Sequence, residues 1–166
     1  VMTSFRLAYC KVHYPEAFYA TYFTTNAEDF DADLIIKGYD AIKAKKKEIE
    51  ELGNDATQKE KGMYIILEVA QEMYARGIKI APVDIYKSSA TEFEVIGPGL
   101  LRPPMTALQG VGENAAIHIV EERENGEFIS KEDFRKRTKI SRTVVETWDK
   151  HGSLGSMSDK NQLSLF

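Results

Sequence analysis

Apolar positions recur with a helical period through most of the first half of the chain. Residues 3–23 carry apolar and aromatic side chains at this spacing, and Pro15 divides them into two predicted helices because proline disrupts a helix interior. The pattern over 32–52 predicts one amphipathic helix. A capping box at Thr57–Glu60 starts a further helix that ends at Gly77. The first half is therefore expected to be largely helical.

The side chains on these helices allow two interpretations each. The aromatic residues of 3–23 favour a packed core over a platform for nucleotides, because an aromatic stripe at helical spacing usually faces the interior. The lysines of the helix over 32–52 favour a solvated face paired with nearby glutamates, and a phosphate-binding patch is the alternative. These lysines are Lys43, Lys45, Lys46 and Lys47.

The pattern changes after Gly77, which predicts a boundary between segments somewhere in 77–105. Residues 78–81 and 93–96 predict short strands, and the Pro- and Gly-rich stretch 97–104 predicts turns. Short helices return after this stretch, and Gly152 to Asn161 has the composition of a flexible linker. No internal repeat is visible.

Composition and charge narrow the possible functions. The chain has 166 residues, 43% of them hydrophobic, and a net charge of −4, so any nucleic-acid binding must depend on local basic clusters. No apolar run is long enough for a membrane span. Val1 to Arg6 does not have the pattern of a secretory signal, and we expect the sequence to be a fragment of a longer protein. The single cysteine, Cys10, is expected to be reduced and buried, and the three histidines show no metal-ligand spacing.

A Gly-x-Gly turn opens an apolar helix at Gly110-Val111-Gly112 and resembles the hairpin of a helix-hairpin-helix motif. Two glycines allow a tight turn and a close approach to phosphate, and the first N–H groups of the next helix point at the anion. The predicted DNA-binding residues here are Gly110, Val111, Gly112 and Asn114. A purely structural turn is the alternative. A dinucleotide site is disfavoured because the third glycine of that fingerprint is missing.

A basic run follows the first hairpin. Its predicted DNA-binding residues are Arg135, Lys136, Arg137, Lys139 and Arg142. Such a run suits a duplex backbone, and a solvated helix face is the alternative. Residues 139–152 are interpreted as a second, degenerate helix-hairpin-helix, with Ile140-Ser141-Arg142 in place of the glycine turn and Ser141 capping the helix after it.

The last five residues form a candidate binding peptide. They are Gln162, Leu163, Ser164, Leu165 and Phe166. Large apolar residues after a polar linker usually serve a partner. The peptide matches the form Gln-Leu-Ser/Asp-Leu-Phe by which bacterial polymerases and repair proteins dock on the sliding clamp, with the three apolar side chains filling pockets and the glutamine hydrogen-bonding.

Longer matches point to one family. The chain resembles the C-terminal end of the PolC-type DNA polymerase III alpha subunit, a bacterial replicative polymerase, in four ordered segments. These are Ala8–Pro15, Pro82–Ser88, Phe128–Arg137 and His151–Leu154. The first is similar to the end of the polymerase fingers, the second precedes the tandem helix-hairpin-helix region, and the last two belong to that region.

The resemblance implies a mainly α fold in four parts. They are the helical end of the fingers (1–77), a connecting segment with short strands and turns (78–107), a tandem helix-hairpin-helix region (108–152) and a flexible tail with the clamp peptide (153–166). The implied activity is primer extension with Mg²⁺ on palm carboxylates, and the implied location is the bacterial cytoplasm, at the replication fork. This segment contains no paired-Asp strand, so we expect no catalytic residue, metal or cofactor in it, with the palm and exonuclease upstream.

The implied partners are duplex DNA, the sliding clamp and the rest of the polymerase chain, with no membrane. Two other functions stay open. A non-catalytic repair adaptor that rides on the clamp would account for the terminal peptide and the hairpin, but not for the aromatic helices of 3–23. A helix-hairpin-helix module of another DNA enzyme, such as a ligase or nuclease, would leave residues 1–77 unexplained.

Overall fold

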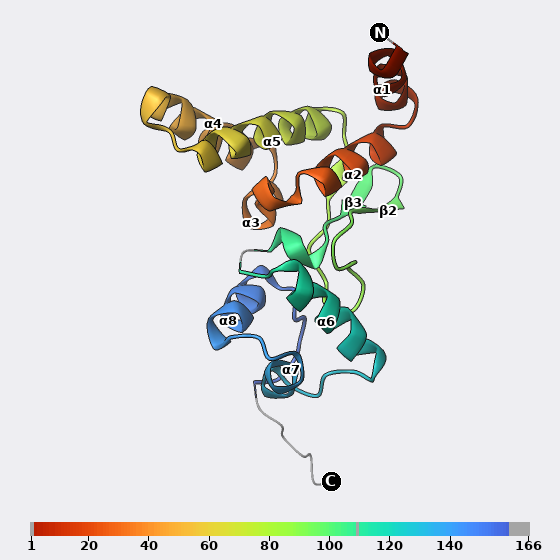
Figure 1. Ribbon diagram of the computed structural model, residues 1–166, viewed down its shortest axis with the longest axis vertical. Helices are drawn as coiled ribbons and strands as arrows, with labels where there is room; N and C mark the ends of the chain where they lie inside the picture. The colour runs from red at the N-terminus through yellow and green to blue at the C-terminus, as the bar shows by residue number, and fades with distance from the viewer. Residues whose placement is uncertain (1, 109, 160–166) are drawn as a thin grey trace.

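The structure, a computed structural model, describes residues 2–108 and 110–159 and is mainly α-helical, as predicted (Figure 1). The first half consists of α1 (Met2–His13), α2 (Pro15–Thr25), η1 (Ala27–Asp29), α3 (Ala32–Ile35), α4 (Tyr39–Leu52), η2 (Gly53–Asp55) and α5 (Gln58–Ala75), where η denotes a 3₁₀ turn. The second half consists of β1 (Lys79–Ile80), β2 (Glu94–Gly97), β3 (Leu100–Arg102), η3 (Met105–Ala107), α6 (Glu113–Glu124), α7 (Lys131–Thr138) and α8 (Arg142–His151).

Local signals determine where the helices begin and break. Pro15 is the first residue of α2, and the capping box of α5 is confirmed: the Thr57 hydroxyl accepts from the Glu60 N–H at 3.2 Å, while the Glu60 carboxylate accepts from the Thr57 N–H at 2.7 Å. The prediction of one helix over 32–52 is wrong. Gly38 has φ +94°, outside the helical region, and it separates α3 from α4.

The aromatic stripe of 3–23 is only partly core. Tyr19 and Phe23 on α2 are fully buried, but α1 buries none of its residues. Phe5 is 71% exposed, and Cys10 is also exposed, so the prediction of a buried thiol is wrong. Burial fails because no face of α1 is covered by the body; its polar contacts to α5 are made at Lys11, which pairs with Glu72 and accepts from Arg76.

A small mixed sheet connects the two halves. Its strand order is β1-β3-β2, with β1 parallel and β2 antiparallel to β3. The strands β1 and β2 lie where the sequence predicts them, but β3 lies in the stretch predicted to form turns. Residues Leu100 to Arg102 are too few for a periodic signal, and their pairing with both neighbours makes the strand.

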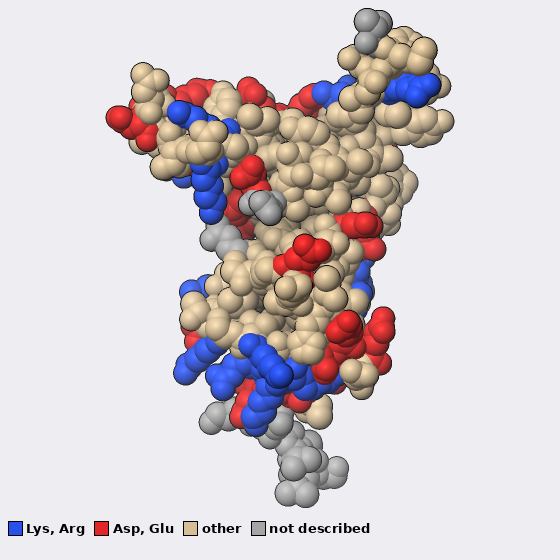
Figure 2. Space-filling view, in the orientation of Figure 1, with Lys and Arg blue, Asp and Glu red and all other residues tan. Residues whose placement is uncertain are grey.

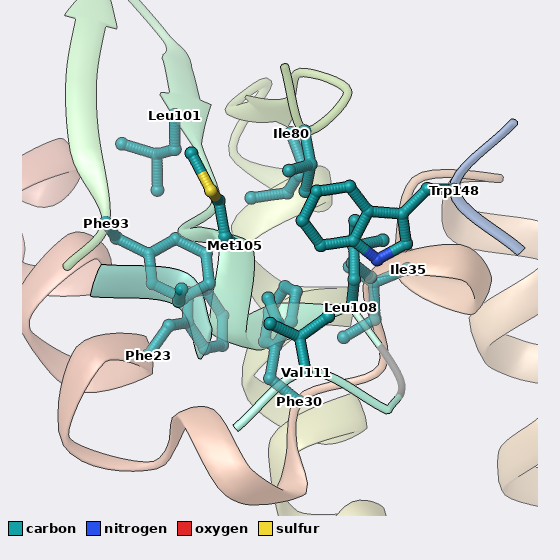
Figure 3. Packing of buried hydrophobic residues seen from close by; sticks show 14 of the residues in the cluster. Phe23, Phe30, Ile35, Ile80, Phe93, Leu101, Met105, Leu108, Val111 and Trp148 are labelled. Carbon is teal, nitrogen blue, oxygen red and sulfur yellow. The ribbon is translucent and has the colours of Figure 1, made fainter. Parts of the chain in front are cut away.

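One hydrophobic cluster runs through the described chain (Figure 3). Phe30 of the first half lies between Phe23 and Phe93, with ring centroids 5.1 and 4.8 Å away. Trp148 of α8 is fully buried in the same cluster as Ile35 of α3 (Figure 3). The predicted boundary in 77–105 therefore does not divide two separate cores.

Polar contacts also join α8 to the first half. The Nδ1 atom of His151, at the end of α8, contacts the Asp33 carboxylate of α3, and its Nε2 atom accepts a long hydrogen bond from Val83 N–H at 3.4 Å. Because Nε2 accepts, Nδ1 carries the proton and donates to Asp33.

The described residues after α8, 152–159, pack on the body, in contrast to the predicted flexible tail from 153. Leu154 is 3% exposed, Ser153 carbonyl accepts from Ile85 N–H at 3.3 Å, and Ser158 carbonyl accepts from Lys131 N–H at 2.9 Å. An apolar side chain and paired backbone groups explain why this polar-looking stretch is ordered.

Candidate nucleic-acid interface

The first hairpin joins the 3₁₀ turn η3 to α6. The sequence suggested a full helix on each side, but only η3 precedes the turn. Val111 is 8% exposed, so its side chain belongs to the core and only its backbone is left to meet a ligand. Gly112 is the N-cap of α6, and its carbonyl accepts from Ala116 N–H at 3.0 Å. Asn114 is exposed in the first turn of α6.

The two glycines of this hairpin differ in what the fold requires. Gly110 has φ +84°, and a Cβ there would lie 3.1 Å from Val144 Cγ2 of α8, so glycine is needed for the turn and for packing. Gly112 has an ordinary φ of −79°, and no atom lies within 4 Å of where its Cβ would be. The fold therefore does not demand glycine at 112, and the space in front of it is open to an approaching ligand.

The second hairpin joins α7 to α8. Lys139 takes the left-handed conformation with φ +57°, Ile140 is 9% exposed, and Ser141 is the N-cap of α8, with its hydroxyl accepting from Val144 N–H at 3.4 Å. The capping role of Ser141 is confirmed. The predicted register, which placed Ile140-Ser141-Arg142 in the turn, is shifted by one residue because the positive φ falls on Lys139.

The two hairpins have the same design, which agrees with the interpretation of residues 139–152 as a second, degenerate helix-hairpin-helix. Each has a left-handed first residue, a buried apolar second residue and an extended N-cap; these are Gly110, Val111 and Gly112 in one, and Lys139, Ile140 and Ser141 in the other. In both, the N-cap carbonyl accepts from the N–H four residues on. The two turns share no residue type, and the one-residue difference in register could have been found only from the order of burial along the two segments.

Lys and Arg side chains gather at the end of the molecule formed by α7 and α8 (Figure 2). Arg135 and Lys139 are exposed, and no carboxylate among the described residues pairs with either. Lys136 contacts Glu132 at 3.0 Å, and Arg142 contacts Glu146 at 2.8 Å. Exposed pairs of this kind are weak, so both cations can exchange a carboxylate for a phosphate.

Arg137 has a different role from its neighbours. Its Nε donates to the Glu122 carboxylate at 3.0 Å, its Nη1 donates to the carbonyls of Gly126 and Glu127 at 3.2 and 3.3 Å, and its guanidinium lies 4.5 Å from the Phe128 ring centroid. These contacts tie the end of α7 to the end of α6. Arg137 is therefore removed from the predicted set of phosphate ligands, because its donors are already used inside the protein.

The first hairpin lines a cleft of about 770 Å³ that faces the turn between α2 and α3. The charged residues of this cleft are Asp29, Lys59, Glu92 and Glu113. Three carboxylates and one lysine make a poor environment for phosphate. The two hairpins thus differ in electrostatics, because exposed cations accompany the second and acids accompany the first.

Three of the four lysines that the sequence placed on this helix, Lys45, Lys46 and Lys47, lie in ion pairs. Lys45 contacts Glu48 at 2.7 Å, Lys47 contacts Glu51 at 3.7 Å, and Lys46 is 3.6 Å from Glu68 of α5. This arrangement favours the solvated face over a phosphate patch.

The predicted clamp peptide, residues 162–166, lies outside the described residues. Within the described ranges, no group of three or more His, Cys, Asp or Glu residues could hold a metal ion. No helix in the same ranges has the length and hydrophobicity to cross a membrane.

Comparison with known proteins agrees with a helix-hairpin-helix motif in the second half of the chain. The helix-hairpin-helix motif family matches residues 77–163. Over all 166 residues the chain is 60% identical to the DNA polymerase III PolC-type of Clostridium perfringens (strain 13 / Type A) and 51% identical to that of Bacillus subtilis (strain 168). The chain spans 11% and 12% of the length of these relatives.

Proposed function

The chain belongs to the helix-hairpin-helix family and corresponds over its whole length to a segment of PolC-type DNA polymerases III, and on this premise we propose that it grips duplex DNA for a replicative polymerase. The observation that carries the proposal is the second hairpin. It repeats the backbone design of the first and lies among exposed cations.

The grip acts on the phosphate backbone. The first N–H groups of α8 point out of the helix start, where they suit an anion, and Lys139 and Arg142 supply charge on either side of the Ser141 cap. These groups carry no base-reading pattern, so binding is independent of sequence and strongly salt-dependent. The first hairpin adds backbone contacts through the open space at Gly112, and these are weaker than those of the second hairpin because acidic side chains line the adjoining cleft.

The rest of the function involves groups outside the described residues. Residues 162–166 dock on the sliding clamp, which keeps the polymerase near its primer and makes rebinding intramolecular. Nucleotidyl transfer with Mg²⁺ takes place in a palm elsewhere in the polymerase chain, because no pair of aspartates on a predicted strand occurs in this sequence.

The test compares two variants that lose the same charge. One replaces Arg135, Lys139 and Arg142 with alanine, and its control replaces Lys43, Lys45 and Lys47 of α4 with alanine. Duplex affinity is measured by fluorescence anisotropy over a series of salt concentrations. Each phosphate contact contributes about 0.9 to the slope of log K against log salt, so the first variant is expected to lower the slope by roughly two to three.

The control variant is expected to keep the original slope, since all three lysines lie on α4, away from the hairpins, and Lys45 and Lys47 pair with glutamates. Equal loss of slope in both variants would mean that net charge alone drives binding. An unchanged slope in the first variant, with its fold intact by circular dichroism, would remove the second hairpin from the interface.

A further inference from the structure

Lys131, the first residue of α7, holds the segment that follows α8. Its Nζ atom lies 2.8 Å from the carboxylate of Asp149 on α8 and 2.8 Å from that of Asp159. Its backbone N–H donates to the Ser158 carbonyl at 2.9 Å. The hydrogen bonds to Asp149 and Asp159 raise the pKa of Lys131, the first more than the second. One residue therefore connects the start of α7, the last turn of α8 and the end of the described chain, which lies beside α7 (Figure 1).

These contacts shorten the connection to the predicted clamp peptide. The sequence indicated a flexible linker over 152–161, but Leu154 is buried, Met157 packs against the core and Asp159 is held by Lys131. Only residues 160 and 161 stand between Asp159 and Gln162. At 3.8 Å for each Cα–Cα step, the three steps from 159 to 162 span roughly 11 Å at most.

The attachment point of the peptide is also close to the proposed duplex contact. Lys131 begins α7 and the second hairpin follows its end, so one helix of 8 residues separates them. At 1.5 Å per residue, this distance is about 12 Å. A short connection between two binding sites raises the effective concentration of the second site once the first is occupied.

We propose that Lys131 is a positioning residue for clamp docking, because it fixes the point at which the terminal peptide leaves the body and so keeps the clamp close to the bound duplex. The proposal rests on the proposed clamp and duplex contacts and adds the length of the connection between them. Effective concentration falls with roughly the −3/2 power of that length. Release of residues 158–159 would give five steps from Met157 to Gln162 and lower it about twofold, and release back to Gly152 would give ten steps and lower it about sixfold.

Two changes lengthen the connection in different ways. Lys131→Pro removes the ammonium and the backbone donor together, and proline suits the first position of a helix. Ser130 before it has φ −158° and ψ 167°, the extended conformation that a residue before proline prefers. The second change inserts three Gly-Gly-Ser repeats after Asp159, which gives twelve steps and alters no residue of the body.

Two further variants serve as controls. Lys131→Arg keeps a cation between the two carboxylates and the backbone N–H. Lys45→Met removes a lysine that contacts Glu48 at 2.7 Å on α4 and does not touch residues 152–159. Both are expected to behave as the unmodified protein.

The test uses a full-length PolC-type polymerase that contains this segment, with the clamp loaded on a primed circular template. The dissociation rate of fluorescently labelled polymerase from the clamp–DNA complex is measured after addition of excess unlabelled polymerase. We expect the insertion to raise this rate about eightfold and Lys131→Pro to raise it about two- to sixfold. Affinity for the clamp without DNA, and for primed DNA without the clamp, should stay within twofold of the original in every variant.

Failure of this inference and failure of the proposed function give different results. An unmodified polymerase that does not bind the clamp would remove the clamp contact itself, and the inference with it. If the unmodified polymerase binds but the insertion leaves dissociation unchanged or slows it, the short connection has no positioning role. If Lys131→Pro weakens binding to the clamp alone or to DNA alone as much as binding to the complex, Lys131 supports one binding site and does not set a distance.

Discussion

Arg137 and Arg135 are two residues apart and do different things. The guanidinium of Arg137 closes the end of α6 through Glu122 and two backbone carbonyls, while Arg135 is exposed. The sequence could identify the basic run but not the direction of each side chain. That direction follows from the phase of α7, which Ser130 caps and Phe134 anchors in the core.

We predict that Arg137→Lys lowers the free energy of unfolding by about 1–3 kcal/mol, because one ammonium cannot replace a fork of charge-assisted hydrogen bonds. Urea unfolding of the 166-residue chain measures this loss. Arg135→Lys is the matched control and should change stability by less than about 0.5 kcal/mol. Similar stability of the two variants would show that the contacts of Arg137 contribute little to the fold.

Cys10 is a second residue whose surroundings could not be predicted from the sequence. Its prediction as a buried thiol followed from the usual behaviour of cysteine, but burial depends on what covers a helix face, and nothing in the described chain covers α1. Local chemistry at Thr57 and Ser141 was predictable, because a cap acts on a backbone N–H three residues away.

At the scale of elements, the two hairpins offer a natural comparison. Both begin with a left-handed residue, which is glycine in the first and lysine in the second. A lysine in this conformation costs about 1 kcal/mol relative to glycine. A lysine at this position in spite of that cost is consistent with a role of its charge in the proposed DNA binding, not in folding.

We therefore predict that Lys139→Gly raises the free energy of unfolding by about 0.5–1 kcal/mol and weakens duplex binding at the same time, because it removes strain and a cation together. Urea unfolding and anisotropy measure the two effects on one sample. We expect the free energy of unfolding to rise while the affinity for duplex DNA falls.

Gly110→Ala is the control in the first hairpin. It should destabilise the fold by 1 kcal/mol or more, since φ is +84° and the new methyl would press on Val144. If Lys139→Gly also destabilised the protein, the left-handed lysine would have to be held by contacts of its own.

Element boundaries were predictable where a cap or a proline signals them, as at Pro15 and Thr57. They were missed where tertiary packing decides. The break at Gly38 interrupts an apolar pattern that would suit a continuous helix, and β3 exists only because two partner strands lie beside it. The second hairpin was predicted, but its register was wrong by one residue because backbone angles and burial repeat between the hairpins while residue types do not.

At the scale of the whole molecule, the family resemblance identified the polymerase relatives from ordered segments, and it did so more securely than any short motif. The single core was not predictable, because composition cannot show that Trp148 and Ile35 belong to one cluster. The placement of this segment at the C-terminal end of such a polymerase stays a prediction.

The proposed clamp peptide concerns how the whole molecule binds a partner. We predict that removing residues 162–166 abolishes binding of the chain to a bacterial sliding clamp but leaves duplex affinity unchanged within twofold, because the peptide and the second hairpin are separate sites. Surface plasmon resonance with immobilised clamp measures the first effect. A chain with the five residues in reversed order is the control for composition. Equal clamp binding by the intact and reversed chains would exclude a specific peptide contact.

The contact between His151 and Asp33 has a mechanical consequence. The helix that follows the second hairpin is fastened at its far end to α3 and, through Trp148, to the common core. A load applied at the second hairpin would therefore reach the first half of the chain through α8. On the proposed grip, tension on a bound duplex would then be shared by both halves of the molecule, because one core joins them.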